Sequence, residues 1–252
     1  MGWGDALMAC GEAKKIHQDT GRKVKIGDKR TLFHEVEIFA NNPYMCSRID
    51  EDGVWLANYI GNRPYIKSVK NGRMVFNTDY KPIAGELFFT DTELEWADKH
   101  APKGDFIIIE PNVKKDYKHT VNKAWYYWQD LVKHDYPFYQ MGYKLENAIT
   151  NHVVTENFRK ALLILSKAKL YVGTDGGLHH AAAALNVPAV VIWTGFTSPE
   201  FLGYDNHVNI YDGGEACGTI SGVCPHCVKN SRNITLERVL DAVDTEWHRA
   251  QR

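Results

Sequence analysis

The stretch YVGTDGGLHHAAAA at residues 171–184 decides the predicted fold. It begins with apolar residues typical of the end of a buried strand, passes through a glycine-containing turn and continues into an alanine-rich helix. Glycines at a helix start let a ligand approach the backbone, and the free N–H groups with the helix dipole favour a phosphate. Asp175 and His180 are polar side chains that can point into the same crevice. This stretch therefore predicts a strand–turn–helix unit that binds a phosphorylated ligand.

The chain after residue 103 alternates short apolar runs with helical patterns. Strands are expected at 106–109, 136–141, 148–154, 170–172, 189–193 and 207–211, and helices at 123–133, 155–167, 177–185 and 235–247. Such alternation predicts a parallel sheet with right-handed crossovers, in which ligands bind at the carboxyl ends of the strands. Asp175 follows one of these ends, and Thr194 and Gly195 follow another.

The chain before residue 103 has a less regular pattern. Helices are expected at 5–20 and 92–100, the second with Asp91 as its N-cap, and short strands at 23–26, 34–39, 54–59 and 73–76. The turn-forming sequence APKGD at 101–105 is the predicted domain boundary. We therefore expect two α/β domains, 1–102 and 103–252, with the last helix available to pack back on the first domain.

Composition and charge exclude several classes of protein. A hydrophobic content of 44% and a charged content of 24% are typical of a soluble globular protein. No apolar run approaches the ~20 residues that span a bilayer, and no signal-peptide pattern is present, so we expect a cytoplasmic protein. The net charge of −1 gives no global electrostatic case for nucleic acid. A local basic cluster at 22–30 keeps that partner as an alternative that is not favoured.

Two charged residues are candidates for catalysis. Asp5 follows Gly4 at an expected helix start, where it is either an N-cap or, if it reaches the second domain, a general base that takes a proton from a hydroxyl nucleophile. Lys123 follows a polar loop, where it is either a solvated surface lysine or a cation for a diphosphate leaving group. His180 is expected to contact a phosphate or a hydroxyl.

Three late cysteines form a candidate metal site. Cys217, Cys224 and Cys227 contain a Cys-x-x-Cys core that resembles half a zinc knuckle. A second Cys-x-x-Cys is absent from the sequence, which leaves a histidine as the candidate fourth ligand. A structural zinc ion and reduced packing cysteines remain the two alternatives.

Four motifs, in order, resemble glycosyltransferase family 9, the heptosyltransferase-like enzymes of the GT-B fold. They are GDAL at 4–7, IIEPN at 108–112, KAW at 123–125 and VGTDGGLHHAAAALNVP at 172–188. The last motif is the most specific, and WTGFTSP at 193–199 also fits. Asn112 stands where the family usually has glycine, and Gly176 stands where it usually has a hydroxyl residue.

The resemblance implies two Rossmann-like domains, the N-terminal one reduced, and an inverting transfer of a sugar from a nucleotide diphosphate sugar to an acceptor hydroxyl. The acceptor is expected to be a glycan or a molecule similar to lipopolysaccharide. The resemblance also implies that Asp5 is the base, that Lys123 is the phosphate cation and that catalysis requires no metal. The donor-binding residues that it implies are Gly4, Asn112, Thr174, Asp175, Gly176, Gly177, Leu178, His180, Thr194 and Gly195.

Two other functions remain as alternatives. A DNA-base glycosyltransferase of viral type would use the basic cluster at 22–30 and would show DNA affinity that depends strongly on salt. A non-catalytic module that binds nucleotide sugars is favoured by the short N-terminal part. The retained Asp5 and Lys123 favour an enzyme over such a module.

Overall fold

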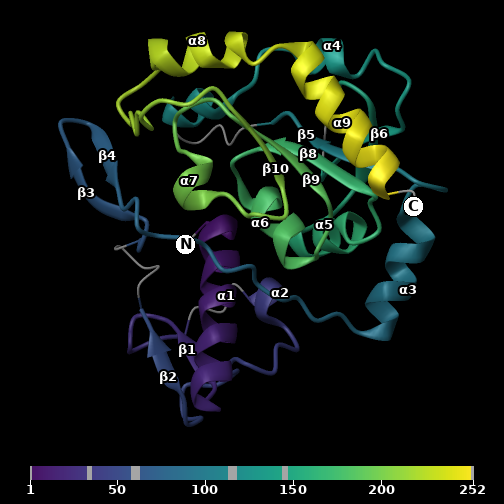
Figure 1. The fold of residues 1–252 in the computed structure, drawn as a ribbon. Coiled ribbons are helices and arrows are strands. Elements are labelled where there is room, and N and C mark those ends of the chain that lie inside the picture. Colours follow the sequence, from purple (N-terminus) through teal and green to yellow (C-terminus); the bar gives the residue numbers. More distant parts are fainter. Residues whose placement is uncertain (1, 33–35, 58–62, 113–117, 144–146, 251–252) are drawn as a thin grey trace.

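The computed structural model describes residues 2–32, 36–57, 63–112, 118–143 and 147–250. A six-stranded parallel sheet forms the centre of the molecule (Figure 1), with the strand order β10-β9-β8-β5-β6-β7. The strands are β5 (Ile107–Glu110), β6 (Phe138–Gly142), β7 (Asn151–Val154), β8 (Leu170–Thr174), β9 (Ala189–Trp193) and β10 (Val208–Tyr211). The predicted α/β class with a parallel sheet is confirmed.

Helices cover both faces of this sheet (Figure 1). Successive residues of a strand point to opposite faces, so Ile108 packs in the core with α5 (Phe158–Leu165) and α6 (Gly177–Ala184), whereas Ile107 packs with α9 (Leu236–Ala250). Strands buried on both faces carry uninterrupted β-branched and apolar residues, as at 189–193. The remaining helices of this part are α4 (Trp128–Leu131), α7 (Pro199–Leu202) and α8 (Pro225–Asn233).

The first hundred residues form smaller elements around one long helix, α1 (Trp3–Thr20). Strands β1 (Val24–Ile26) and β2 (Val54–Leu56) pair in parallel, and β3 (Ile66–Lys70) and β4 (Arg73–Phe76) form an antiparallel hairpin. Helix α1 packs against α6, which joins these elements to the large sheet. Two further helices are α2 (Val36–Phe39) and α3 (Asp91–His100).

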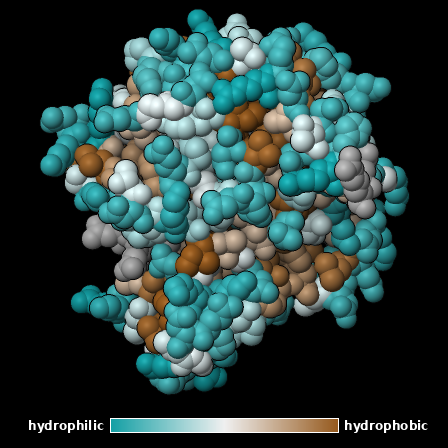
Figure 2. Space-filling model, in the orientation of Figure 1, coloured by the Kyte–Doolittle hydropathy of each residue, from teal (hydrophilic) through white to brown (hydrophobic). Residues whose placement is uncertain are grey.

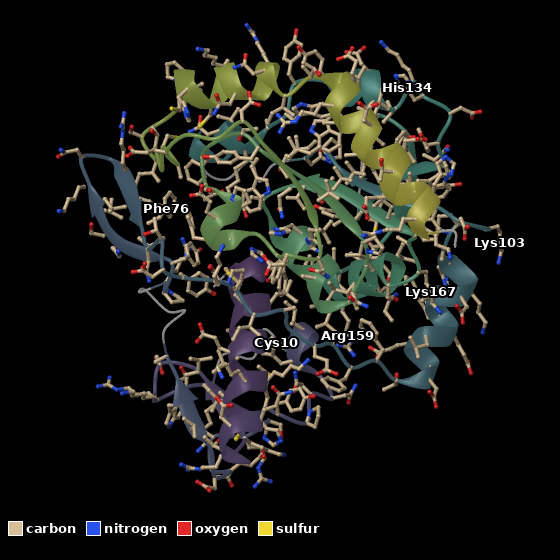
Figure 3. All side chains as sticks on the ribbon, in the orientation of Figure 1. Cys10, Phe76, Lys103, His134, Arg159 and Lys167 are labelled. Atoms are coloured by element: carbon tan, nitrogen blue, oxygen red, sulfur yellow. The ribbon has the colours of Figure 1, made fainter. Side chains whose placement is uncertain are left out.

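Two side chains fasten this first part to the helices of the large sheet (Figure 3). Phe76, at the base of the hairpin, stacks on Phe201 of α7 with ring centroids 4.8 Å apart. Arg159 of α5 donates to Glu93 of α3 at 2.5 and 2.9 Å and to the carbonyl of Phe88 at 2.7 Å. A forked guanidinium that meets a carboxylate at two points fixes orientation as well as distance.

Several sequence predictions need correction. Residues 36–39 form helix α2 instead of part of a strand, and residues 33–35 lie outside the described part. The helix expected at 123–133 is only the short α4, preceded by a 3-10 helix, η1 (Lys118–Lys123). The N-cap of α3 is Thr90, one residue before the expected Asp91, and α5 begins at Phe158, three residues after the expected start of that helix. Strand β3 was not predicted.

The division of the chain at residue 102, and the reduction of its first domain, remain proposals. The principal contacts of the last helix, α9, are with β8, β9 and α4. The expectation that this helix also packs against the first domain remains a proposal. Within the described residues, each helix is either too short or too polar to cross a bilayer. The face shown in Figure 2 is mostly hydrophilic, with hydrophobic residues in scattered groups.

Candidate functional site

A cavity of about 690 Å³ opens at the carboxyl ends of β5 and β8. Glu110 and Asn112 from β5 and the loop after it, and Thr174 and Asp175 from the end of β8, line it. The chain order runs outward in opposite directions from these two neighbouring strands, so the cavity lies at the topological switch point of the sheet. Open α/β sheets bind ligands at such points.

The N-termini of α1 and α6 meet at this cavity. Gly4 in the first turn of α1 approaches α6 so closely that a Cβ there would lie 2.8 Å from Cδ2 of His180. Trp3 of α1 stacks on Phe158 of α5, with ring centroids 4.7 Å apart and planes 7° apart. The N-cap of α6 is Gly176, which has no side chain to bond the first N–H groups of the helix. Two positive helix ends with accessible N–H groups favour an anionic ligand.

Asp175 lies close to three other polar side chains of the cavity wall. Its Oδ2 lies 2.6 Å from Nζ of Lys123 and accepts a hydrogen bond of 2.6 Å from the hydroxyl of Thr197. Its Oδ1 lies 4.0 Å from Nε2 of His180. Burial by itself raises the pKa of Asp175, but the Lys123 ammonium and its other partners hold it below its usual value. The Lys123 ammonium also lies 5.4 Å from the centroid of the Phe196 ring.

Asp5 faces the same cavity from α1. Its Oδ1 accepts a hydrogen bond of 2.7 Å from the hydroxyl of Tyr65, and its Oδ2 lies 3.1 Å from Nε of Arg63. The backbone N–H of Gly2 also donates to Oδ2, at 3.3 Å, so the carboxylate helps to cap α1. The expected N-cap role of Asp5 needs correction, because the N-cap of α1 is Gly2 and Asp5 is the third residue of the helix. The Asp5 side chain also lines the cavity, as the predicted role of a base requires.

Glu110 is a carboxyl group of the cavity wall whose pKa is raised, whereas that of Asp175 is lowered. Burial raises its pKa to about 7, against a bond from the backbone N–H of Asn112. The hydroxyl of Tyr171 is also buried and has no hydrogen-bond partner among the described residues. The part of the cavity near β5 is thus a poorly solvated region in which Glu110 changes charge near neutral pH.

A group of buried histidines lies behind the cavity wall. His180 contacts the hydroxyl of Tyr204 through Nδ1 at 3.0 Å, and burial lowers its pKa to about 4. The rings of His179 and His207 meet edge to face near it, with centroids 5.5 Å apart, and burial lowers the pKa of both, to about 4 for His207. These rings are therefore neutral at neutral pH.

The structure brings most of the predicted site residues together. Ten of the residues expected at the site line the cavity: Gly4, Asp5, Asn112, Lys123, Thr174, Asp175, Gly176, Gly177, Leu178 and His180. Thr194 and Gly195 do not line it in the described part of the chain, which corrects the expectation that they share the cleft. Thr194 instead donates to the backbone carbonyl of Asn122, and Gly195, at φ +90°, lies under the ring of His226.

Sequence reasoning missed four polar residues of the cavity. Arg63 and Tyr65 are distant in sequence from every motif, and no local pattern could have pointed to them. Glu110 and Thr197 lie within the quoted motifs, Glu110 as the last residue of β5 and Thr197 in the loop after β9, and a position at the carboxyl end of a strand was the available signal.

The cysteine cluster lies beside this site and not within it. The ligand atoms of Cys217, Cys224, His226 and Cys227 all lie within 4.8 Å of one another. Cys217 and Cys227 have their sulfur atoms 3.1 Å apart, and the bond that they share lowers the pKa of Cys217 to about 5 and raises that of Cys227. Nδ1 of His226 is buried and has no hydrogen-bond partner among the described residues. Three thiols and an imidazole nitrogen are a set that suits zinc.

Residues 139–220 match the model of "Glycosyltransferase family 9 (heptosyltransferase)", a range that includes Asp175 but neither Asp5 nor Lys123. The glycosyl transferase family 9 structure from Veillonella parvula DSM 2008 is similar to 99% of this chain over 95% of its own length, with 12% identity and a TM-score of 0.64. That similarity shows a common fold over nearly the whole chain. No curated protein matches the sequence.

Two solved structures from Escherichia coli are similar over a smaller share of their own length. ADP-heptose lps heptosyltransferase II is 18% identical, with 66% of this chain and 54% of that chain covered and a TM-score of 0.49. The iron-containing dodecameric glycosyltransferase TibC is 16% identical, with 71% and 50% covered and a TM-score of 0.48. The chain spans about half the length of these two proteins. The resemblance to glycosyltransferase family 9 is thus confirmed: residues 139–220 match the model of that family, and nearly the whole chain has the fold of a family 9 structure.

Proposed function

We propose that the protein is an inverting glycosyltransferase that moves a sugar from a nucleotide diphosphate sugar to an acceptor hydroxyl. The observation that carries this proposal is the facing pair of sites in one cavity: the Asp175–Lys123 pair at the start of α6, and Asp5 at the start of α1. One side suits a diphosphate and the other suits a base. The family match over 139–220 supports the same class of reaction.

The diphosphate of the donor binds between Lys123 and the N-terminus of α6. The uncapped N–H groups after Gly176 donate to phosphate oxygens, and the Lys123 ammonium neutralises charge as the leaving group forms. Asp175, which accepts a hydrogen bond from the hydroxyl of Thr197, holds the ammonium in place before the donor arrives. Because these groups can stabilise the leaving diphosphate without a metal ion, we propose that catalysis needs no metal. A donor of the ADP, UDP or GDP type fits this scheme.

Asp5 takes the acceptor proton in a single displacement. The acceptor oxygen attacks the anomeric carbon as the bond from that carbon to the diphosphate oxygen breaks, and the hydroxyl proton passes to the Asp5 carboxylate. One displacement inverts the anomeric configuration. Tyr65 and Arg63 orient the carboxylate through contacts of 2.7 and 3.1 Å. The acceptor is proposed to be a glycan or a molecule similar to lipopolysaccharide.

The alternative of a DNA acceptor loses support from the basic cluster. Arg22 pairs with Asp52 at 2.9 Å and Lys23 pairs with Glu51 at 3.5 Å, while Lys25 is buried and lies 5.6 Å from the centroid of the Trp55 ring. Cations that already have acidic partners offer less charge to a phosphate backbone. We therefore retain glycan transfer as the proposal.

The test uses the donor without its acceptor. A panel of ADP, UDP and GDP sugars is incubated with the protein, and release of free nucleotide is followed, since water can replace the acceptor slowly. Asp5→Asn should lower this release about 10²- to 10⁴-fold while donor affinity by calorimetry stays within about twofold. Asp19→Asn, a change of an exposed acid on the same helix, is the matched control and should release nucleotide at the normal rate.

Two outcomes would contradict the proposal. Near-normal release by Asp5→Asn would remove the base assignment. Donor binding by the unchanged protein with no release from any sugar would favour the non-catalytic binding module instead.

We also propose that Cys217, Cys224 and Cys227, with His226, hold a structural zinc ion. The buried Nδ1 of His226 supports this, because a polar atom without a partner in that position is costly unless a ligand meets it. A bound zinc ion would tie the loop that bears Cys217 to the start of α8.

A further inference from the structure

We propose that Asn122 is a positioning residue that fixes Lys123 by anchoring it to the loop at 217–224. This inference rests on the proposed function, since it concerns the cation of the same diphosphate site. Asn122 is 2% exposed, although it occupies a 3-10 helix that precedes irregular chain. A fully buried amide must satisfy both of its ends, so its partners define where this helix lies.

The side chain of Asn122 bonds the loop at three points. Its Nδ2 donates to the carbonyls of Thr219 and Gly222 at 3.2 and 2.8 Å. Its Oδ1 accepts from the backbone N–H of Cys224 at 2.7 Å. The three contacts span about a hundred residues of sequence and join η1 to the N-cap of α8, so the loop and the backbone next to Lys123 are held as one unit.

The backbone of Asn122 is fixed from the sheet side. The hydroxyl of Thr194, one residue beyond β9, donates to the Asn122 carbonyl at 2.5 Å. The C-terminal end of η1 is therefore held by a hydrogen bond from the residue after β9 on one side and by the loop at 217–224 on the other. The Lys123 side chain leaves from this fixed point and reaches Oδ2 of Asp175 at 2.6 Å.

The same loop also holds the surface on which the Lys123 ammonium lies. The N–H of Cys217 donates to the carbonyl of Gly195 at 2.8 Å, and the N–H of Gly218 donates to the carbonyl of Phe196 at 3.1 Å. The Phe196 ring packs in a small apolar cluster with Cys224 and Cys227. One loop thus sets both the origin of the lysine side chain and the ring beneath its charged end.

This arrangement bears on function because lysine has four rotatable bonds. A long flexible side chain reaches one point reliably only when its backbone and its contacts are fixed, and a displacement of about 1 Å at a reacting centre can cost about a hundredfold in rate. Asn122 therefore acts on the diphosphate through Lys123 without touching it.

The experiment measures the affinity for inorganic pyrophosphate and for ADP by calorimetry, in Asn122→Ala and in the nearly isosteric Thr194→Val. Both variants should bind about tenfold more weakly, because each loosens the anchor of Lys123. In a Lys123→Ala background the same two changes should have no further effect, within about twofold, since residues that act through one group are not additive.

Asn42→Ala is the matched control. Asn42 is also a buried amide, 7% exposed, that donates twice and accepts once: it donates to Cys10 and to the carbonyl of Glu86, and it accepts from the N–H of Tyr44. Its loss should lower the melting temperature but leave pyrophosphate affinity unchanged.

The failure of this inference differs from the failure of the proposed function. If Lys123→Ala weakens pyrophosphate and ADP binding but Asn122→Ala and Thr194→Val do not, only the positioning role is overturned. If Asn122→Ala and Thr194→Val weaken binding further in the Lys123→Ala background, the positioning role is overturned as well. If the unchanged protein and Lys123→Ala bind both probes equally, the diphosphate site itself is wrong and the inference falls with it.

Discussion

Gly4 and His180 lie so close together that a Cβ on Gly4 would be 2.8 Å from Cδ2 of the histidine ring. The first residue belongs to α1 and the second to α6, so this contact sets how near the two helix N-termini come. Both helix N-termini line the cavity, and the distance between them determines whether Asp5 and the start of α6 can act on one ligand.

Gly4→Ala should therefore lower donor turnover and destabilise the fold by about 1–3 kcal/mol, because the added methyl group must displace a buried ring. Thermal unfolding and nucleotide release measure the two effects. Gly176→Ala is the control for stability, since a Cβ there would meet only the carbonyl oxygen of Thr174, at 3.8 Å. A normal melting temperature for Gly4→Ala would show that the helices can separate freely.

Glu110 should make donor binding depend on pH. Its pKa of about 7 means that the carboxyl group is neutral below neutral pH and negative above it. A negative wall repels a diphosphate, so donor affinity should fall as pH rises through about 7. Glu110→Gln stays neutral and should lose this part of the pH dependence. Calorimetry of ADP binding between pH 6 and 8.5 in both proteins gives the comparison, and identical profiles would exclude Glu110 as the cause.

The buried histidines should weaken the fold in mild acid. Burial lowers the pKa of His179 and of His207 in the folded chain, so the unfolded chain binds more protons once pH falls below the usual histidine pKa of about 6.5. Stability is then complete above that pH and declines toward pH 4, by about 1.4 kcal/mol per pH unit for each such group.

Denaturant titrations across this range test the effect of His207→Gln. In this variant, the slope of the unfolding free energy against pH should decrease by the contribution of a single histidine. An unchanged slope would mean that His207 takes up its proton in the folded chain without cost.

Removal of a metal should loosen the cysteine loop. We expect metal analysis to find about one zinc per chain and a chelator to lower the melting temperature, because a structural zinc binds the folded chain and not the unfolded one. Cys224→Ser should give the same loss and make the protein insensitive to the chelator. Cys46→Ser, which changes a thiol far from the cluster in sequence, is the control. A metal-free protein with unchanged melting would favour reduced packing cysteines.

The predictable part of this molecule is the part with local signals. Strand β8 and helix α6 follow from an apolar run, a glycine turn and an alanine run, each of which acts over a few residues. The strand predicted at 34–39 was wrong over residues 36–39. The alternating Val36 and Ile38 suit a strand, whereas the chain forms a short helix there, in which Ile38 packs into the core. Periodicity in four residues cannot separate these outcomes.

The site followed the same rule. Asp5, Lys123 and Asp175 lie in motifs, and the fold brings all three to one cavity. Tyr65 and Arg63 reach Asp5 across about sixty residues of sequence, and Asn122 reaches Cys224 across about a hundred, so only tertiary structure reveals them. Thr194 looked like a cavity residue because it follows a strand, but its hydroxyl turns to the backbone of η1.

The β3–β4 hairpin carries a mechanical consequence. The N–H of Met74 donates to the carbonyl of Gly218 at 2.8 Å, and the N–H of Ile220 donates to the carbonyl of Gly72 at 2.9 Å. Two backbone hydrogen bonds thus connect the hairpin to the cysteine loop. A clamshell motion that swung the first hundred residues away from the large sheet would tear these bonds. Entry of a substrate by such a motion therefore costs both hydrogen bonds, whereas entry through the mouth of the cavity leaves them intact.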